Sequence, residues 1–347
     1  MLARDEQQTE ETMTAYRAVM LTRKGGPEVL EVVDLPLVPP GPGELRVRVT
    51  AAGVGATDGI MLKGGYPFAP KIPFVPGYEA VGIVDAIGPG VSSFAVGQRV
   101  AAMTVYGAFA ESLTRKAEEF LPVPEGISDA AAAAVILNFV TAWQMIHRVA
   151  MVRDGATALV TGASGGVGSA ALQLLRLAGV KAYGAASAGK HELVRRFGAV
   201  PIDYRAGRVD ELVRRFEPDG VDYAFDAVGG KSAGACVRAL RPGGTVVGFG
   251  FMGAPGALNL IATFVNLLLG APLRGRRGRF YGITALYRRN PLPFREDLPK
   301  IFALLKEGKI DPAIDRTLPL LAAREAIELL ASGTVKGKIV LTNSAGN

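Results

Sequence analysis

The run LVTGASGGVG at residues 159–168 constrains the fold of this chain more than any other stretch. It is preceded by ATALVT (156–161), which is apolar and favours a strand, and followed by SAALQLLRLAG (169–179), whose leucines have helical spacing. A strand, a tight glycine-rich turn and a helix in this order predict the opening of a dinucleotide-binding βαβ unit.

The glycines of this turn have distinct expected roles. Gly165 and Gly166 let the backbone approach a pyrophosphate, and Gly168 lets the helix pack closely on the strand. The first N–H groups of the helix, together with its dipole, attract the phosphate charge. Ala163 replaces the usual first glycine, which matters little unless that residue must be left-handed. The residues expected at the pyrophosphate are Ser164, Gly165, Gly166 and Val167.

Size and charge limit the possible classes of protein. The chain has 347 residues, 49% hydrophobic and 20% charged, which predicts a packed globular protein of about two domains. Its net charge is +7, but the basic residues are scattered except in LRGRRGR (273–279), so we expect no nucleic-acid partner. A basic protein instead suits an anionic cofactor.

Several features indicate the compartment. A single cysteine, Cys236, excludes a disulfide within the chain and fits a reducing cytoplasm. Residues 1–14 are polar and acidic, so we expect a flexible tail and no signal peptide. The most apolar span, 257–273, is shorter than the ~20 residues of a membrane helix and contains Asn259 and Asn266. We therefore expect a cytoplasmic protein with no integral membrane segment.

The first third of the chain is rich in strand patterns. Residues 45–49 alternate apolar and basic side chains, as a half-buried strand does. Other strand-like runs lie at 18–22, 29–36, 44–54 and 80–88. These strands predict a partly open antiparallel β-barrel.

From residue 154 the pattern changes to alternating strands and helices, which predicts a doubly wound parallel sheet. Its strands are expected at 158–161, 181–185, 223–227, 245–250 and 279–284. Residues 129–152 predict one or two helices that bridge the two parts. Helices near 295–307 and 322–331 and a strand at 338–342 are expected to return to the barrel. The expected domains are 15–137 with 287–347, and 138–286.

Taken together, these motifs resemble the medium-chain dehydrogenase/reductase superfamily, and most of all its zinc-free quinone oxidoreductase branch. The matching stretches are AAGVGATDGIMLKGGYP (51–67), PGYEAVGIVDAIGPGV (76–91), the ASGGVG turn, FDAVGG (225–230) and GKIVL (337–341). The resemblance implies an α/β protein with a GroES-like β-barrel domain and a Rossmann domain that binds NADP.

The zinc-binding members of this superfamily carry a cysteine and a histidine where this chain has Gly55 and Tyr78. A catalytic zinc usually needs three Cys, His or carboxylate ligands. Cys236, His147 and His191 lie on predicted helices without partners of this kind, so we interpret them as structural or surface groups. We expect no metal.

The choice of cofactor follows from the end of the second Rossmann strand. NAD-preferring folds place an acid there, whereas this chain has no acid before Glu192 and offers Ser187 and Lys190. A 2′-phosphate prefers hydroxyl donors and positive charge, so we expect NADPH. The resemblance adds Tyr204 to the phosphate pocket, where Arg205 could join it.

The resemblance also implies the remaining cofactor contacts. Thr141 would approach the nicotinamide, and Lys338 would reach the cofactor from the C-terminal segment. The wall beside the nicotinamide and its ribose would comprise Val228, Gly229, Phe249, Gly250 and Phe251. Plain core packing is an equal alternative for Phe249.

Without a metal, the acceptor of the hydride must already be electrophilic, such as a quinone or an α,β-unsaturated carbonyl compound. The oxygen that gains charge then needs a hydrogen-bond donor, for which the candidates are Tyr66, Tyr78 and Tyr281. Many relatives carry Asn where Gly55 lies. We interpret Asp58 as structural, since it can hold its loop through backbone hydrogen bonds.

Two alternatives to a general quinone or alkene reductase remain open. One is a non-catalytic nucleotide-binding protein associated with vesicles or membranes, and the other is an enoyl reductase of a specialised biosynthetic pathway. The apolar and then arginine-rich segment 257–279 predicts a substrate lid or a dimer contact, with a membrane-surface helix as the further alternative. We expect a homodimer that acts on a small molecule.

Overall fold

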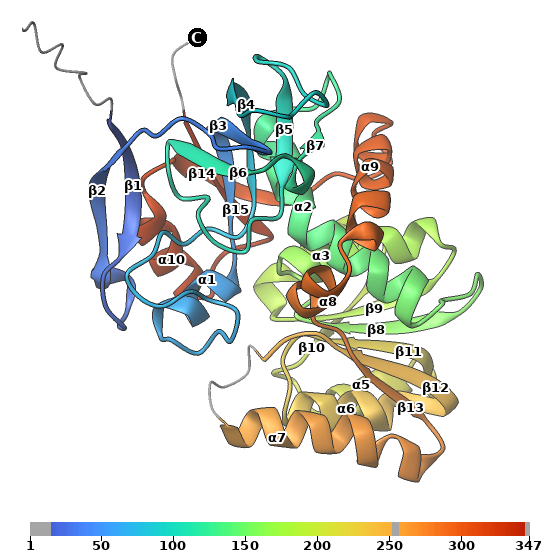
Figure 1. Ribbon diagram of the computed structural model, residues 1–347. Coiled ribbons are helices and arrows are strands. Elements are labelled where there is room, and N and C mark those ends of the chain that lie inside the picture. The colour runs from blue at the N-terminus through green and yellow to red at the C-terminus, as the bar shows by residue number, and fades with distance from the viewer. Residues whose placement is uncertain (1–14, 252–256, 344–347) are drawn as a thin grey trace, which may run out of the picture.

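The computed structural model describes residues 15–251 and 257–343, arranged around two β-sheets (Figure 1). The expected tail, 1–14, lies outside the described residues. The expected class is confirmed: one sheet is mostly antiparallel and wraps upon itself, and the other is parallel and covered by helices.

The mostly antiparallel sheet is built around one long strand. Its strand order is β14 (Ile314–Pro319), β15 (Lys338–Thr342), β3 (Glu44–Val54), β4 (Ala80–Ile87), β5 (Arg99–Ala102) and β7 (Leu121–Pro122). β6 (Ser112–Lys116) also pairs with β3, and β1 (Ala15–Leu21) with β2 (Leu30–Pro36) forms a separate ribbon. The predicted alternation holds in β3, where Leu45 and Val47 are buried and Arg48 is exposed.

The parallel sheet has the strand order of a dinucleotide-binding fold. The order is β10 (Val200–Asp203), β9 (Lys181–Ala186), β8 (Thr157–Thr161), β11 (Val221–Asp226), β12 (Leu240–Gly248) and β13 (Arg277–Phe280). Along the chain, β9 and β10 are added on one side of β8, and β11 to β13 are then added on its other side. In such sheets, ligands bind at the switch point between these two halves, which here lies between β8 and β11. Every residue of β11 is buried, as expected for a strand with helices on both faces.

Helices cover both faces of this sheet. α3 (Gly166–Leu177) and α4 (His191–Arg196) pack against each other, while α5 (Val209–Arg214), α6 (Lys231–Ala239) and α7 (Ala257–Val265) lie below the sheet in Figure 1. α2 (Asp129–Trp143) packs on both α3 and β3. This helix therefore lies between the two parts of the molecule, as the sequence predicts.

α2 and the helical turn that continues it are apolar around most of their circumference. Residues 129–149 are long and apolar enough to span a bilayer, but 78% of the 18-residue window that meets this test is buried inside the fold. A helix that is apolar all round and covered by protein is a core helix.

The C-terminal part returns to the first sheet. After α8 (Ile283–Arg289), α9 (Leu292–Lys306) and α10 (Ala323–Ala331), β15 pairs antiparallel with β3. The expected strand at 279–284 is right for its first residues and wrong for Ile283 and Thr284, which open α8 after Gly282. The proposed domain limits at 137 and 286 fall within α2 and α8, and they stay predictions.

Candidate nucleotide and substrate site

The glycine-rich turn has the geometry of a phosphate-binding turn. Gly162 takes the left-handed conformation (φ +62°), so Ala163 does not need to be a glycine. Gly165 N–H donates to Gly162 O at 3.0 Å, and α3 then begins at Gly166. A Cβ on Gly168 would lie 2.2 Å from Gly162 O, which confirms the close packing of helix on strand. The first N–H groups of α3 have no partner within the helix.

The last strand of the chain closes onto this turn. Gly165 forms a parallel bridge with Gly337, and Gly337 N–H donates to Ser164 O at 2.8 Å. The turn is thus joined to the residue that directly precedes β15 and, through this strand, to the first sheet.

α2 presents polar side chains to the start of α3. A Cβ on Gly166 would meet the amide of Asn138 at 2.4 Å. One turn further along, Thr141 is buried, and its hydroxyl has no hydrogen-bond partner among the described residues. A buried hydroxyl left unpaired within the protein is a natural contact for a bound ligand.

Asp226, which the sequence analysis missed, organises the turn after β11. Its buried carboxylate accepts hydrogen bonds from Thr161 Oγ1 at 2.7 Å, Ser232 Oγ at 2.6 Å and Gly229 N–H at 2.9 Å. This network links the ends of β8 and β11, where Val228 is half-buried. The signal was present in FDAVGG, because a short acid at a strand end often binds turn N–H groups.

The segment after β12 lies at the same edge. Phe249 N–H donates to Asp226 O at 2.9 Å, and a Cβ on Gly250 would lie 2.5 Å from Ala227 O. Phe249 is half-buried against the core, and Phe251 stacks on Phe280 with ring centroids 5.2 Å apart. The structure therefore gathers Gly229, Phe249, Gly250 and the ends of β8 and β11 at one edge of the sheet.

The residues expected at the 2′-phosphate follow β9, and one of them, Lys190, binds backbone oxygens of the protein. Lys190 Nζ donates to Gly333 O and Val335 O, each at 2.7 Å, and its partial burial lowers its pKa. Ser187 opens the short helical turn 188–190 without a side-chain cap bond. Tyr204 is 48% exposed, with the Arg205 guanidinium 5.7 Å from its ring centroid.

Two of the three candidate tyrosines meet in a hydroxyl cluster. Tyr66 OH lies 2.8 Å from Tyr78 OH and 2.5 Å from Thr284 Oγ1, and Tyr78 OH also contacts Thr284. Thr284 belongs to α8 and the tyrosines to the first part of the chain, so the cluster joins the two parts. Burial raises the pKa of both phenols, which therefore stay protonated. Thr284 was missed because RFYGIT (279–284) was interpreted as a strand.

Tyr281 is placed differently from the other two. It is buried, and its hydroxyl donates to Gln144 Oε1 at 2.7 Å. The amide of Gln144 in turn donates to Asp297, which pairs with Arg148 at 2.7 Å. This chain of contacts fixes α9 against the helical turn 144–149 that continues α2, and it occupies the Tyr281 hydroxyl, so Tyr66 and Tyr78 remain the candidate donors.

Lys338 is buried and ion-paired with Glu79, another residue that the sequence analysis missed. The other oxygen of Glu79 accepts the N–H of Leu137 at 2.6 Å. Asp58 lies in α1 (Ala56–Leu62), where its Oδ2 accepts the N–H of Gly55 at 2.8 Å, as expected for a loop-holding carboxylate. A Cβ on Gly55 would lie 3.8 Å from Lys338 Nζ, so this position borders the ammonium.

Within 15–251 and 257–343, no group of three or more His, Cys, Asp or Glu residues could hold a metal ion. His147 packs on Trp143, with centroids 4.2 Å apart, and burial lowers its pKa. His191 contacts Ala186 O at 3.2 Å, and the buried thiol of Cys236 has a raised pKa. Independence of zinc stays a prediction.

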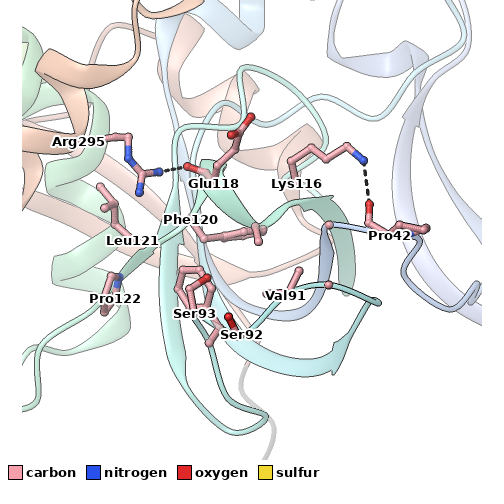
Figure 2. A pocket seen from close by; sticks show the side chains of 14 residues that line it. Pro42, Val91, Ser92, Ser93, Lys116, Glu118, Phe120, Leu121, Pro122 and Arg295 are labelled. Carbon is pink, nitrogen blue, oxygen red and sulfur yellow. Dashed lines mark hydrogen bonds between the residues drawn. The ribbon is translucent and has the colours of Figure 1, made fainter.

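A hollow of about 710 Å³ lies elsewhere, between the antiparallel sheet and α9. Figure 2 shows Arg295 bonded to the backbone of Glu118 and Lys116 bonded to Pro42 at its rim. None of the expected site residues lines this hollow. The candidate site residues thus lie outside this hollow: the glycine-rich turn and Thr141 are the candidates for the nucleotide, and the hydroxyl cluster is the candidate for the acceptor.

α7 exposes an apolar row on the face turned away from α6. Asn266 and Thr263 bind the backbone of Gly230 on the inner side. The exposed apolar residues of this region are Leu258, Leu260, Ile261, Val265, Leu268, Leu269 and Leu273. The exposed arginines 274, 277 and 279 follow, and β13 is the free edge of the parallel sheet.

Two family models match this chain. One, described as "Alcohol dehydrogenase GroES-like domain", matches residues 41–125, and the other, "Zinc-binding dehydrogenase", matches residues 197–341. The second description concerns that family as a whole. Gly55 and Tyr78, at which the resemblance noted above implies zinc ligands in other members, lie within the first match and outside the second.

Two curated relatives illustrate the range of similar proteins. The synaptic vesicle membrane protein VAT-1 homolog of Mus musculus is 31% identical, over 94% of this chain and 83% of its own length. A mycocerosic acid synthase-like polyketide synthase of Mycobacterium tuberculosis is 32% identical over 91% of this chain, which spans only 15% of that protein.

Solved structures resemble the whole fold. A mycobacterial protein determined in complex with NADPH is 30% identical, with a TM-score of 0.84 over 94% of this chain and 99% of its own. A quinone oxidoreductase of Pseudomonas syringae pv. Tomato DC3000 is 29% identical, with a TM-score of 0.85 over 95% of this chain and 100% of its own.

Proposed function

This chain belongs to the medium-chain dehydrogenase/reductase superfamily, in its zinc-free quinone oxidoreductase branch, and from this premise we propose that it is an NADPH-dependent reductase of quinones or of activated alkenes. The observation that carries the proposal is the position of the Tyr66–Tyr78–Thr284 hydroxyl cluster. It lies where the first part of the chain meets α8, which directly follows the nucleotide-binding sheet.

The nucleotide fits the residues present. The first turn of α3 offers N–H groups to the pyrophosphate, and Thr141 offers a buried hydroxyl without a partner among the described residues. The end of β9 supplies Ser187 and Lys190 without an acid before Glu192, which favours the 2′-phosphate of NADPH over the free hydroxyl of NADH. When bound, NADPH supplies the hydride.

The residues of the chain position the acceptor and stabilise its charge. An acceptor oxygen that gains negative charge can take a hydrogen bond from Tyr66 or Tyr78, whose phenols stay neutral across the physiological pH range. A quinone and an α,β-unsaturated carbonyl both carry such an oxygen, so the cluster suits either class. At Gly55, where many relatives carry a larger side chain, a Cβ would contact Lys338 Nζ at 3.8 Å and Asp58 Oδ2 at 3.9 Å without a clash.

The direct experiment mixes the purified full chain with NADPH and a panel of quinones and enones, and follows the nicotinamide absorbance. We expect oxidation of NADPH with at least one class. Tight binding of NADPH without turnover of any member of either class would contradict the proposal. A preference for enoyl thioesters within the panel would favour the biosynthetic alternative, for which the polyketide synthase relative is the supporting observation.

We also propose that the protein is a cytoplasmic homodimer, in which β13 and the apolar row of α7 meet a second copy. A free sheet edge beside an apolar helix face is the kind of surface that a partner covers. The alternative of membrane association is favoured by the exposed arginines that follow the row and by the vesicle-protein relative.

A further inference from the structure

Asp58 is a fully buried carboxyl group beside the proposed substrate site. Its Oδ2 accepts the N–H of Gly55 at 2.8 Å, whereas its Oδ1 has no hydrogen-bond partner among the described residues. A loop-holding aspartate needs only the first of these bonds. The unpaired oxygen is therefore not explained by the structural role alone, since an ionised carboxylate normally gathers several donors when it is buried.

Among the residues that the structure describes, the charged neighbours of Asp58 leave it without a counter-ion of its own. Lys338 on β15 is the nearby cation, and it is already paired with Glu79, which directly precedes β4. Asp58 is thus a second carboxylate beside a single ammonium group. α10 packs on the other side of α1 through Ile327, which lies 3.9 Å from the Cβ position of Gly59.

The tyrosines of the hydroxyl cluster face the same carboxyl group. An ionised Asp58 acts electrostatically on both Tyr66 and Tyr78, and its carboxyl group also faces the backbone of Gly77, next to Tyr78. Burial, opposed by the Gly55 N–H and by Lys338, raises the pKa of Asp58 to about 7. Its charge therefore changes in the physiological range, while the tyrosines stay neutral.

Building on the proposed function, we propose that Asp58 is a positioning residue that must be neutral for efficient reduction. With Asp58 protonated, the positive charge of Lys338 and the negative charge of Glu79 cancel. The hydroxyl cluster can then stabilise an acceptor oxygen that becomes negative. With Asp58 ionised, an uncompensated negative charge acts on Tyr66 and Tyr78 and opposes the charge that forms on the acceptor. No proton is transferred from Asp58 to the acceptor in this role.

The first test compares the wild type with Asp58→Asn, a neutral side chain of nearly equal shape, in single-turnover reduction of the best acceptor from pH 6 to pH 8.5. We expect the wild-type rate to fall about fivefold between pH 7 and pH 8, because the neutral fraction of a group with a pKa of about 7 falls by that factor. The variant should keep a rate close to the wild-type maximum across the whole range. Asp34→Asn, on the exposed ribbon strand β2, is the matched control and should retain the wild-type profile.

Two kinetic outcomes would overturn the proposal. A folded Asp58→Asn protein that loses the reaction at pH 6 would make the carboxyl group a proton donor or a direct contact. Identical pH profiles for wild type and variant would show that the titrating group lies elsewhere.

The second test needs neither cofactor nor acceptor. We expect an infrared band of a protonated carboxylic acid in the nucleotide-free protein at pH 6, which disappears on raising the pH past 8 and is absent from Asp58→Asn. A wild-type spectrum without that band would overturn the proposal. Absence of any reductase activity together with a normal titration of this band would instead count against the proposed function alone.

Discussion

The Nζ atom of Lys190 lies 2.7 Å from the backbone oxygen of Val335 and thereby ties the expected 2′-phosphate pocket to the segment before β15. The same ammonium also binds Gly333 O at 2.7 Å. The two carbonyls hold the charge next to Ser187 without neutralising it, so Lys190 has both a structural partner and charge available for an anion.

Replacing Lys190 should change the preference between the two nicotinamide cofactors. Because a charge-assisted hydrogen bond contributes about 1.5–3 kcal/mol, Lys190→Ala should weaken NADPH binding by roughly one to two orders of magnitude and leave NADH nearly unchanged. Calorimetric titration of both nucleotides measures this. Lys309→Ala, which removes an exposed cation paired with Glu307, is the control. Equal losses for NADPH and NADH would show that Lys190 does not contact the 2′-phosphate.

Removing a hydroxyl from the cluster should affect the reaction more than the binding of NADPH. Tyr78→Phe leaves the apolar packing in place but removes a hydroxyl that can donate to the acceptor oxygen. Loss of a donor to a developing oxyanion costs about a hundredfold in rate, so kcat should fall by that order while the Kd for NADPH is retained. Thr284→Val removes a partner of both tyrosines rather than a donor to the acceptor, so its loss of rate should be smaller. Tyr281→Phe serves as the comparison, and it should lower the thermal stability more than the rate. A larger loss of rate in Tyr281→Phe would reverse our assignment.

Asp58 should make the folded state less stable as the pH rises. Its pKa is about 7 in the folded protein and 3.8 ordinarily, so between these values only the unfolded chain releases the proton. Stability then falls by about 1.4 kcal/mol per pH unit over that window and levels off above it. Asp58→Asn lacks this loss. In urea unfolding, the free energy of unfolding of the variant should therefore rise relative to that of the wild type from pH 5 to pH 7. If the difference between the two free energies stays constant with pH, the raised pKa of Asp58 is contradicted.

The apolar row of α7 should decide the state of association. The double substitution Ile261→Glu and Leu268→Glu places charges on this face, and we expect sedimentation to change from dimer to monomer. Leu177→Glu, at an exposed position on α3, is the control. A wild type that is monomeric but floats with anionic vesicles, and loses that property in Arg274→Ala with Arg277→Ala, would favour the membrane alternative.

Local patterns predicted those parts of the fold that depend on neighbouring residues. The turn at 162–168 carries its own strand, glycines and helix, and β3 alternates along its length. α2 lacks a polar face, which indicates burial on all sides before any partner is known. In each case the residues of a single segment are enough to predict its structure or its burial.

Contacts between distant segments could not be predicted in this way. Thr284 reaches Tyr66 and Tyr78 only because α8 begins two residues after Tyr281, and the pattern around it also suits a strand. The pairing of Lys338 with Glu79 depends on the antiparallel register of β15 on β3. Tyr281 illustrates the converse, since its sequence neighbourhood does not reveal that Gln144 occupies its hydroxyl.

The bond from Gly337 to Ser164 has a consequence for biosynthesis. Most of the nucleotide-binding sheet is translated long before β15, yet the glycine-rich turn receives one of its hydrogen bonds from that late strand. During synthesis on the ribosome the strands of the parallel sheet are therefore made before this bond can form, and the turn gains its full set of bonds only after residue 337 has emerged.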